Sequence, residues 1–265
     1  MLRICVAGSL MGLMLGVPVC VLAQQAANVS APKLEVATIK PSAPDEHARS
    51  VGWEGRKFTA HYSTMSQVMQ FAYGVQAKQI LGAPAWFDAT TYDVDVQADV
   101  AEPTREQWKV VLQQMLSERL QLKVHLEQKV MPAYVLSVDK DGPKLKPPMD
   151  EEGMESFGVR IARGPHELVI VRSIRGSMGE LASELQRVEM DRPVVDKTGL
   201  TGRFNFEMRA TSTKPFFAGE TPDTSDDAPP ILFTALREQL GLRLEPAKTE
   251  VGCLAVDRVE RPSEN

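Results

Sequence analysis

The stretch "MLSERLQLKVHLE", residues 115–127, sets the expected fold because "ALREQLGLRLE", residues 235–245, repeats its pattern 120 residues later. Leucines and a glutamate recur at matching positions, and Lys123 of the first copy corresponds to Arg243 of the second. In both copies the apolar residues pass from a helical spacing to alternation with polar residues. Each copy therefore predicts the end of a helix followed by a half-buried strand.

Further pairs of segments recur in the same order in the two halves of the chain. They are "TMSQVMQFAYG" (64–74) with "SMGELASELQR" (177–187), "YDVDVQA" (92–98) with "FNFEMRA" (204–210), and "VLSVD" (135–139) with "CLAVD" (253–257). A common order of this kind indicates an internal duplication. It predicts an α+β fold of two tandem related units, each a small, mostly antiparallel sheet packed with two helices.

A linker joins the two expected units, and the second unit carries an insertion that the first lacks. We expect the first unit at residues 33–140, the linker at 141–166 and the second unit at 167–262. The second unit carries an insertion at 211–230, rich in Pro, Gly and acidic residues, which we expect to be mobile. We expect the neighbouring residues Phe216 and Phe217 within it to dock either on the core or on a partner.

The expected helices have marked ends and apolar faces. Capping boxes, in which a hydroxyl and a later side chain satisfy each other's backbone amides, mark three starts: Thr64 with Gln67, Thr104 with Gln107, and Ser177 with Glu180. Apolar stripes follow the last two, at Trp108, Val111, Leu112, Met115 and Leu116 and at Met178, Leu181, Ala182 and Leu185. A fourth helix is expected from Pro229 and Pro230, ending at Gly241. Further strands are expected at 33–40, 57–62 and 167–174.

The N-terminus has the features of a secretory signal peptide at residues 1–23: Arg3, an apolar run and the small-residue ending "VLA". We expect cleavage after Ala23 and export to the periplasm or the medium. Two alternatives stay open. A membrane anchor needs about 20 predominantly apolar residues, whereas Pro18 interrupts a shorter run here. A lipid on Cys20 needs small residues before the cysteine, where "VPV" stands.

Charge and cysteine content narrow the classes of partner. The formal net charge is −5, and removal of Arg3 with the leader makes it more negative by one. Nucleic acid and anionic lipid surfaces select clustered Lys and Arg, so neither is an expected partner. After cleavage only Cys253 remains, so no internal disulfide is expected. Cys253 lies in the apolar "VGCLAVDRVE", which predicts a strand and a buried, inert thiol.

Several motifs together resemble a known family. "LEVATIKP", "ILGAPAWFDATTYDVDVQA", "VVDKTGLTGRFNF", "ALREQLGLRLEPAK" and "VDRVERPSEN" resemble, in order, the signature stretches of a large secreted family of unknown function, abundant in soil bacteria and especially acidobacteria. The resemblance covers about residues 33–265 and brings no established activity and no catalytic residues. A more distant likeness is to the short N-terminal domain of secretins and TonB-dependent receptors. That likeness implies periplasmic domains that recognise protein segments, often through a sheet edge.

The clearest enzyme-like motif is "SVDK", Ser137 to Lys140, with "KTG", Lys197 to Gly199, as in serine acyl-enzymes. That chemistry needs the serine at a helix start, so that the lysine one turn later assists its deprotonation. Here "AYVLSVDKDGPK" predicts a strand that runs into a turn, so Ser137 and Lys140 are expected to point in different directions. The motif "RGSMG" at 175–179 has Arg175 where a nucleophile elbow has glycine.

The sequence also offers few candidates for a metal site or for an aromatic recognition groove. His47, His61, His125 and His166 are scattered, without a zinc-binding spacing, and predict surface positions. Asp93 and Asp95 share one strand face, which could hold a cation but more simply predicts a solvated face. Trp86 and Phe87 could line a recognition groove, although a core position is the simpler expectation.

We therefore expect no catalytic, cofactor-binding or metal-binding residues and no cofactor. The predicted function is that of an exported, non-catalytic recognition or assembly module that binds an envelope protein or a peptide, with no membrane span after signal cleavage. One alternative is a secreted serine hydrolase or acyl-transferase that uses Ser137 and Lys140. Another is a small-ligand carrier with an enclosed cavity between the two units.

Overall fold

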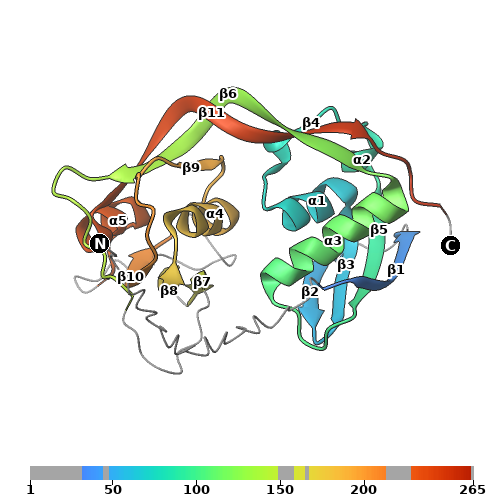
Figure 1. The fold of residues 1–265 in the computed structure, drawn as a ribbon, viewed down its shortest axis with the longest axis horizontal. Helices are drawn as coiled ribbons and strands as arrows, with labels where there is room; N and C mark the ends of the chain where they lie inside the picture. The colour runs from blue at the N-terminus through green and yellow to red at the C-terminus, as the bar shows by residue number, and fades with distance from the viewer. Residues whose placement is uncertain (1–31, 44–47, 149–157, 165–166, 213–227, 264–265) are drawn as a thin grey trace, which may run out of the picture. The chain divides into compact units, whose positions relative to one another are not determined.

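A computed structural model describes residues 32–43, 48–148, 158–164, 167–212 and 228–263. Contacts join the described residues into one compact unit. The fold is α+β, as expected, with eleven strands and five α-helices among these residues. The strands form three sheets, and two clusters of buried apolar residues form two cores. We call the parts around these cores the first lobe and the second lobe (Figure 1).

The first lobe packs helices on one face of a four-stranded sheet of order β1-β5-β3-β2. Burial alternates along β5, where Tyr92, Val94 and Val96 are buried and the residues between them are half-buried. The buried side chains pack with the apolar stripe that begins at Trp108. The elements of this lobe are β1 (Leu34–Pro41), β2 (Ser50–Glu54), β3 (Lys57–Thr64), α1 (Met65–Tyr73), η1 (Ala77–Gln79), α2 (Trp86–Ala89), β5 (Thr91–Ala98) and α3 (Arg105–Leu120).

The second lobe has a three-stranded sheet of order β10-β8-β7 with two helices. Its core is formed by Val169 and Val171 of the sheet, the predicted stripe of the first helix, and Leu232, Leu236 and Leu240 of the second. The elements of this lobe are β7 (Gly158–Arg163), β8 (Leu168–Gly176), α4 (Met178–Val188), β10 (Phe204–Thr211) and α5 (Leu232–Leu240).

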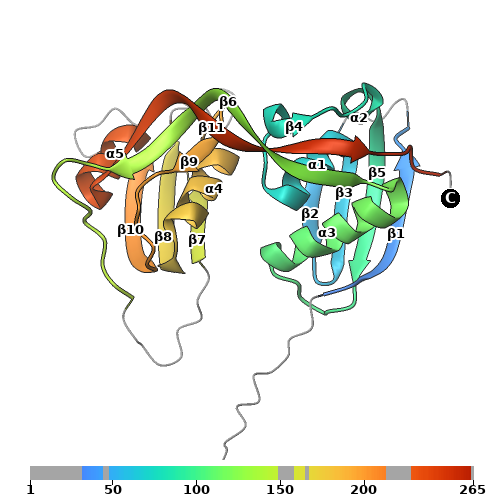
Figure 2. The same cartoon turned by 45° about the horizontal axis from the view of Figure 1, so that its top comes forward.

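Two long strands are shared by the lobes. β6 (Lys123–Val138) and β11 (Leu242–Arg258) pair antiparallel along their length, with β4 (Ile80–Leu81) parallel to β11 and β9 (Val194–Asp196) parallel to β6. Leu136 of β6 lies in the core of the second lobe, and Leu254 of β11 lies in the core of the first. The pair therefore extends from one lobe to the other, as Figures 1 and 2 show.

This sharing differs from the expected tandem units at 33–140 and 167–262. Each unit was expected to hold its own strands, with separate strands at 122–127 and 135–139, whereas the structure has one continuous strand there. Strand β7 also lies inside the expected linker at 141–166. The strand expected after Leu120 was to be half-buried, but the middle of β6 is exposed, and Leu126, on the face expected to be buried, is 78% exposed.

The order of elements is the same in the two lobes. Apart from η1 and α2, which have no counterpart, the first runs β3, α1, β4, β5, α3, β6, and the second runs β8, α4, β9, β10, α5, β11. The sheet order β5-β3-β2 likewise has its counterpart in β10-β8-β7. A duplication predicts this order, and the duplication itself stays a prediction that superposition of the lobes can test.

The expected helix starts after Thr64, Thr104 and Ser177 and the end at Gly241 are confirmed, whereas the fourth helix begins at Leu232 and not at Pro229. All three capping boxes form, and in each the hydroxyl of Thr64, Thr104 or Ser177 accepts a hydrogen bond from the third backbone amide of the helix. The predicted stripes after Thr104 and Ser177 are buried. Gly241 ends α5 with φ +64°, as expected from a glycine at that position. No helix among the described residues is long and apolar enough to cross a membrane.

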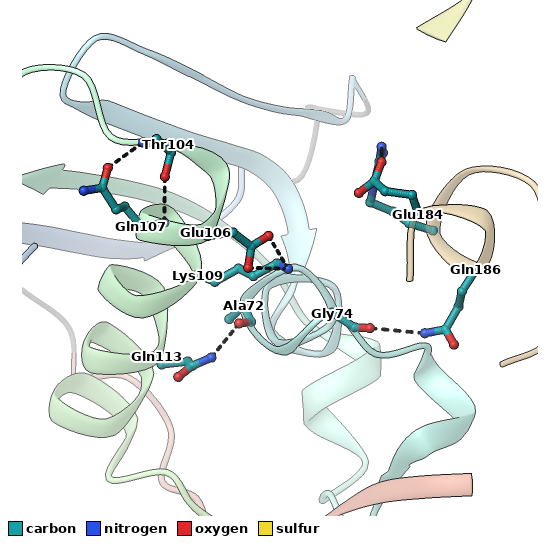
Figure 3. A network of polar contacts seen from close by, with 10 residues as sticks. Ala72, Gly74, Thr104, Glu106, Gln107, Lys109, Gln113, Glu184 and Gln186 are labelled. Carbon is teal, nitrogen blue, oxygen red and sulfur yellow. Dashed lines mark hydrogen bonds and ion pairs between the residues drawn. The ribbon is translucent and has the colours of Figure 1, made fainter. Parts of the chain in front are cut away.

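Hydrogen bonds of glutamine side chains connect the lobes. The Nε2 atom of Gln186 on α4 donates to the carbonyl of Gly74 (3.1 Å), at the end of α1, and to Oε1 of Gln79 (3.1 Å). Gln76 Nε2 donates to the carbonyl of Met190 (3.2 Å) in return. Figure 3 shows the bond from Gln186 to Gly74, with Gln113 of α3 bonded to Ala72 of α1 beside it. Because side-chain amides between packed helices need hydrogen-bond partners, these bonds favour one arrangement of α1 and α4.

Candidate recognition site at the edge strand β2

Strand β2 is the terminal strand of the first-lobe sheet, and β3 is the only described strand that pairs with it. A two-residue turn, Gly55 and Arg56, joins the two strands, so Glu54 pairs with Lys57. A turn of this kind is closed by hydrogen bonds between the residues that flank it, and in an antiparallel pair bonded and non-bonded positions then alternate. The backbone amides of Val51 and Trp53 therefore point away from β3, to the free edge.

The other terminal strands are protected against pairing in the ways that natural sheets use. β7 carries Arg160 and Arg163, and charged side chains disfavour an added strand. β1 ends at Pro41 and has a bulge near its start, between Leu34 and Val36. β2 has only one charged residue, Glu54, together with a glycine and two large apolar side chains. β10 carries Glu207 and Arg209, and the backbone of Arg209 is already hydrogen-bonded to the side chain of Gln239 on α5. Among the terminal strands of five or more described residues, β2 is therefore the one best suited to accept another strand.

The two apolar side chains of β2 are exposed. Val51 is 43% exposed and Trp53 is 41% exposed. All five residues of β2, with Lys57 and Thr59 of β3, line an open depression of about 590 Å³. An exposed edge with apolar side chains normally marks a pairing site or an aggregation hazard.

Beneath these side chains lies a group of aromatic rings. The ring of Phe71 on α1 lies 5.8 Å from the ring of Trp53, edge to face, and 5.3 Å from that of Phe58. The ring of Trp108 on α3 lies 5.7 Å from Phe58. A narrow pit between β2 and α1 is lined by Val51, Phe58, Ala60, Ser63, Gln67, Val68 and Phe71. The rings hold Trp53 in place from below, so its exposed surface is a fixed feature of the edge.

Arg105, the first residue of α3, lies against the same rings. Its guanidinium carbon is 5.0 Å from the centre of Phe71 and 6.0 Å from that of Trp53. Its Nε atom is buried without a hydrogen-bond partner, and within the described residues Arg105 has no ion pair. Burial lowers the pKa of Arg105, and the neighbouring charge of Arg187 lowers it further, against the effect of Glu184 and Glu106. An arginine still keeps its charge.

The other charged groups around Arg105 are paired with one another. Lys109 Nζ is 2.7 Å from Glu106 Oε1, one turn along α3, as Figure 3 shows. Arg187 Nε on α4 donates to Glu184 Oε1 at 3.1 Å. Thr104 and Gln107 are occupied by their capping box. Among the residues that the structure places, the guanidinium of Arg105 is therefore a cation beside an apolar edge without a carboxylate partner.

The sequence reasoning missed both β2 and Arg105. The segment "SVGWEGRKF" does hold a hairpin signal, because Val51 and Trp53 alternate with small or polar residues before a Gly-containing turn. Arg105 gives no such signal. Its proximity to Trp53 depends on the packing of α3 against the sheet, 52 residues further along the chain.

The acyl-enzyme motif does not have the geometry its chemistry needs. Ser137 lies in β6 opposite Arg243 of β11, and Lys140 follows in a turn, so the two are not one helical turn apart. The structure does bring the backbone of Lys197 next to β6, because the amide of Lys197 donates a hydrogen bond to the carbonyl of Leu136 (2.8 Å). The side chain of Lys197 instead bonds to Thr249 Oγ1 (2.6 Å).

The side chains of His61, His125 and Asp93 have polar neighbours in the structure. His125 is exposed, with Nδ1 2.9 Å from Asp257, while His61 lies 3.9 Å from Asp93. His47 and His166 lie outside the described residues. Asp93 Oδ1 accepts hydrogen bonds from Ser42 Oγ (2.8 Å) and the amide of Tyr62 (2.9 Å). Within the described residues no three His, Cys, Asp or Glu side chains gather as metal ligands would.

Three other expected positions can be placed. Phe87 is fully buried in the first core, and Trp86 packs against it partly buried, so the core expectation is confirmed for Phe87. Cys253 is fully buried, as expected, and burial raises the pKa of its thiol. A raised thiol pKa disfavours the reactive thiolate. Residues 213–227 of the expected insertion, with Phe216 and Phe217, lie outside the described residues, as do Ala23 and Cys20.

The fold and this site define an α+β protein in which, among the described residues, β2 pairs with β3 alone and lies beside an arginine without an ion pair. A family model described as a protein of unknown function (DUF3738) matches residues 66–259. The match covers more than half of the chain, and the chain belongs to this family. Neither the curated proteins nor the solved structures gave a match. The soil-bacterial origin and the likeness to secretin and TonB-receptor domains stay predictions.

Proposed function

We propose that this protein is an exported, non-catalytic recognition module that captures an extended segment of an envelope protein or peptide by strand addition at β2. The observation that carries the proposal is that β3 is the only described strand paired with β2, whose Val51 and Trp53 side chains are exposed. The sequence of residues 1–23, with its charged start, apolar run and small-residue ending, supports export.

Strand addition uses two kinds of contact, and β2 offers both. The outward amides and carbonyls of Val51 and Trp53 supply main-chain hydrogen bonds, and alternate side chains of the guest strand find surfaces that give selectivity. The exposed side chains of Val51 and Trp53 offer such a surface for an apolar side chain. The open depression beside β2 lies on the first lobe alone, so it supports a peptide groove better than an enclosed cavity for a small-molecule carrier.

The test is selection of random decapeptides displayed on phage against the mature protein, followed by binding measurements with the selected peptides. Val51→Pro removes one outward amide without touching the bonds to β3, since proline is tolerated on strand edges. We expect Val51→Pro to weaken binding at least tenfold, as measured by fluorescence anisotropy. Trp53→Lys, which places a charge on the edge, should weaken it as well.

The matched control is Leu126→Ser, which removes a still more exposed apolar side chain from β6 and should leave binding unchanged. Failure to select any peptide whose binding depends on Val51 and Trp53 would overturn the proposal. Labelling of the protein by a serine-reactive fluorophosphonate, abolished in Ser137→Ala, would overturn its non-catalytic part.

A further inference from the structure

We infer that the segment captured at β2 carries an acidic residue, recognised by Arg105, with an apolar residue two positions away. The inference rests on the proposed function and names the chemistry of the partner. It follows from the position of Arg105, a cation without a partner carboxylate among the described residues, directly beside the strand edge.

The geometry of an added strand determines which of its residues can reach Arg105. A residue directly opposite Trp53 has its Cβ about 5 Å from that of Trp53 and projects from the same face of the sheet. Trp53 contacts Phe71 and Arg105 on the face that α1 and α3 cover. The guest residue opposite Trp53 is therefore the one whose side chain is directed to the guanidinium.

The residue two positions away on the guest strand lies opposite Val51 and projects to the same face. There it meets the exposed side chain of Val51, at the rim of the narrow pit that Val51, Phe58 and Phe71 line. An apolar side chain fits this surface, because its lining is predominantly apolar and a buried polar group without a partner costs free energy. The expected motif is an acidic and an apolar residue separated by one residue of any kind.

The charge around Arg105 favours a carboxylate over other guests. Arg105 begins α3, and the N-terminus of a helix carries partial positive charge. Glu106 and Glu184 are already neutralised by Lys109 and Arg187. The aromatic rings below Arg105 restrict its motion and exclude water from one side, which strengthens a charge-assisted hydrogen bond. The whole chain is acidic, with a net charge of −5, so this attraction is local to the site.

The experiment sequences the peptides that the protein selects from the same decapeptide library. We expect an acidic residue to be enriched next-but-one to an apolar residue. For a selected peptide, replacement of its Glu by Gln should weaken binding to the wild-type protein about tenfold or more, as expected for loss of a hydrogen bond between charged groups. The same replacement should have no effect on binding to Arg105→Gln.

Two further variants sharpen the test. Arg105→Glu should bind the Glu-to-Lys form of the peptide better than the original, which reports a direct charge contact instead of a structural role. Arg261→Gln is the matched control, because Arg261 also lies over an aromatic ring, 5.5 Å from Trp86, in a different part of the lobe. It should keep the preference for acidic peptides.

The outcomes separate the two proposals. If peptides are selected and Val51→Pro weakens their binding, but no acidic residue is enriched, the inference about Arg105 is overturned and strand addition stands. If an acidic residue is enriched but Arg105→Gln keeps the preference, another group recognises it and the inference is again overturned. If Val51→Pro weakens the binding of no selected peptide, both proposals are overturned.

Discussion

At the scale of single residues, two glycines in the same backbone conformation have different surroundings. Gly74 ends α1 with φ +68°, and Gly241 ends α5 with φ +64°. A Cβ atom added at Gly74 would have Lys109 Nζ at 3.7 Å as its nearest neighbour, an ordinary contact. A Cβ atom added at Gly241 would overlap with the backbone oxygen of Gly142. The segment after β6 thus packs directly on the end of α5.

This difference predicts unequal effects of the same substitution. Gly74→Ala should lower the free energy of unfolding by about 1–2 kcal/mol, the cost of a left-handed conformation for a residue with a Cβ. Gly241→Ala should add a further ~1–3 kcal/mol, because the backbone around Gly142 must move. Urea unfolding followed by circular dichroism measures both values. Equal losses in the two variants would contradict the close packing at Gly241.

At the scale of elements, the sequence predicted those with strong local signals. Thr64, Thr104 and Ser177 begin helices because their hydroxyls and the later Gln or Glu satisfy free amides, which depends on four neighbouring residues only. β5 was predictable because one of its faces is buried and the other is not. The continuity of β6 and β11 was not, because the middle of β6 is exposed and is held by pairing with a distant segment of the chain.

The candidate site was less predictable than the fold. Ser137, Lys197 and the histidines stood out by residue type, whereas the structure gives them local structural contacts. Trp53 and Arg105 are ordinary residue types whose importance depends on exposure and on the lack of a partner. The exposure of Trp53 and the lack of a partner for Arg105 both result from tertiary packing, which cannot be inferred from a short segment of the sequence.

The cap at the start of α3 gives a prediction at this scale. Thr104→Ala removes the hydroxyl that accepts from the amide of Gln107, and should lower the free energy of unfolding by about 1 kcal/mol. Thr104→Ser keeps the hydroxyl and should retain most of the stability. Chemical denaturation of both variants is the measurement. If serine destabilises as much as alanine, the threonine methyl and not the cap is responsible.

At the scale of the whole molecule, the shared strands make the two cores depend on each other. β6 supplies Leu136 to the second core, and β11 supplies Leu254 to the first. Hydrogen bonds from Gln76 and Gln186 add contacts between α1, α4 and their following loops. We expect the described part of the chain to unfold in one cooperative transition, because neither lobe can lose its share of the β6 and β11 pair alone.

The three tryptophans allow a test, because Trp53, Trp86 and Trp108 all lie in the first lobe. Leu236→Ala opens a cavity in the core of the second lobe and should cost about 2–5 kcal/mol. With coupled lobes, the melting temperature reported by tryptophan fluorescence should fall by roughly 2–4 °C per kcal/mol. Leu126→Ser, at an exposed position, is the control and should leave it unchanged. An unchanged tryptophan transition in Leu236→Ala would show that the lobes unfold independently.

The pairing of β6 with β11 also sets an order of events during translation. Apart from β6 and β11, the first lobe has all its strands and helices once Leu120 has been synthesised, and once Leu122 follows its core still lacks Leu254. Until that residue emerges from the ribosome, the nascent first lobe exposes the apolar surface that β11 later covers. A chain of this design therefore needs a holding chaperone, or a delay before folding, until β11 has been made.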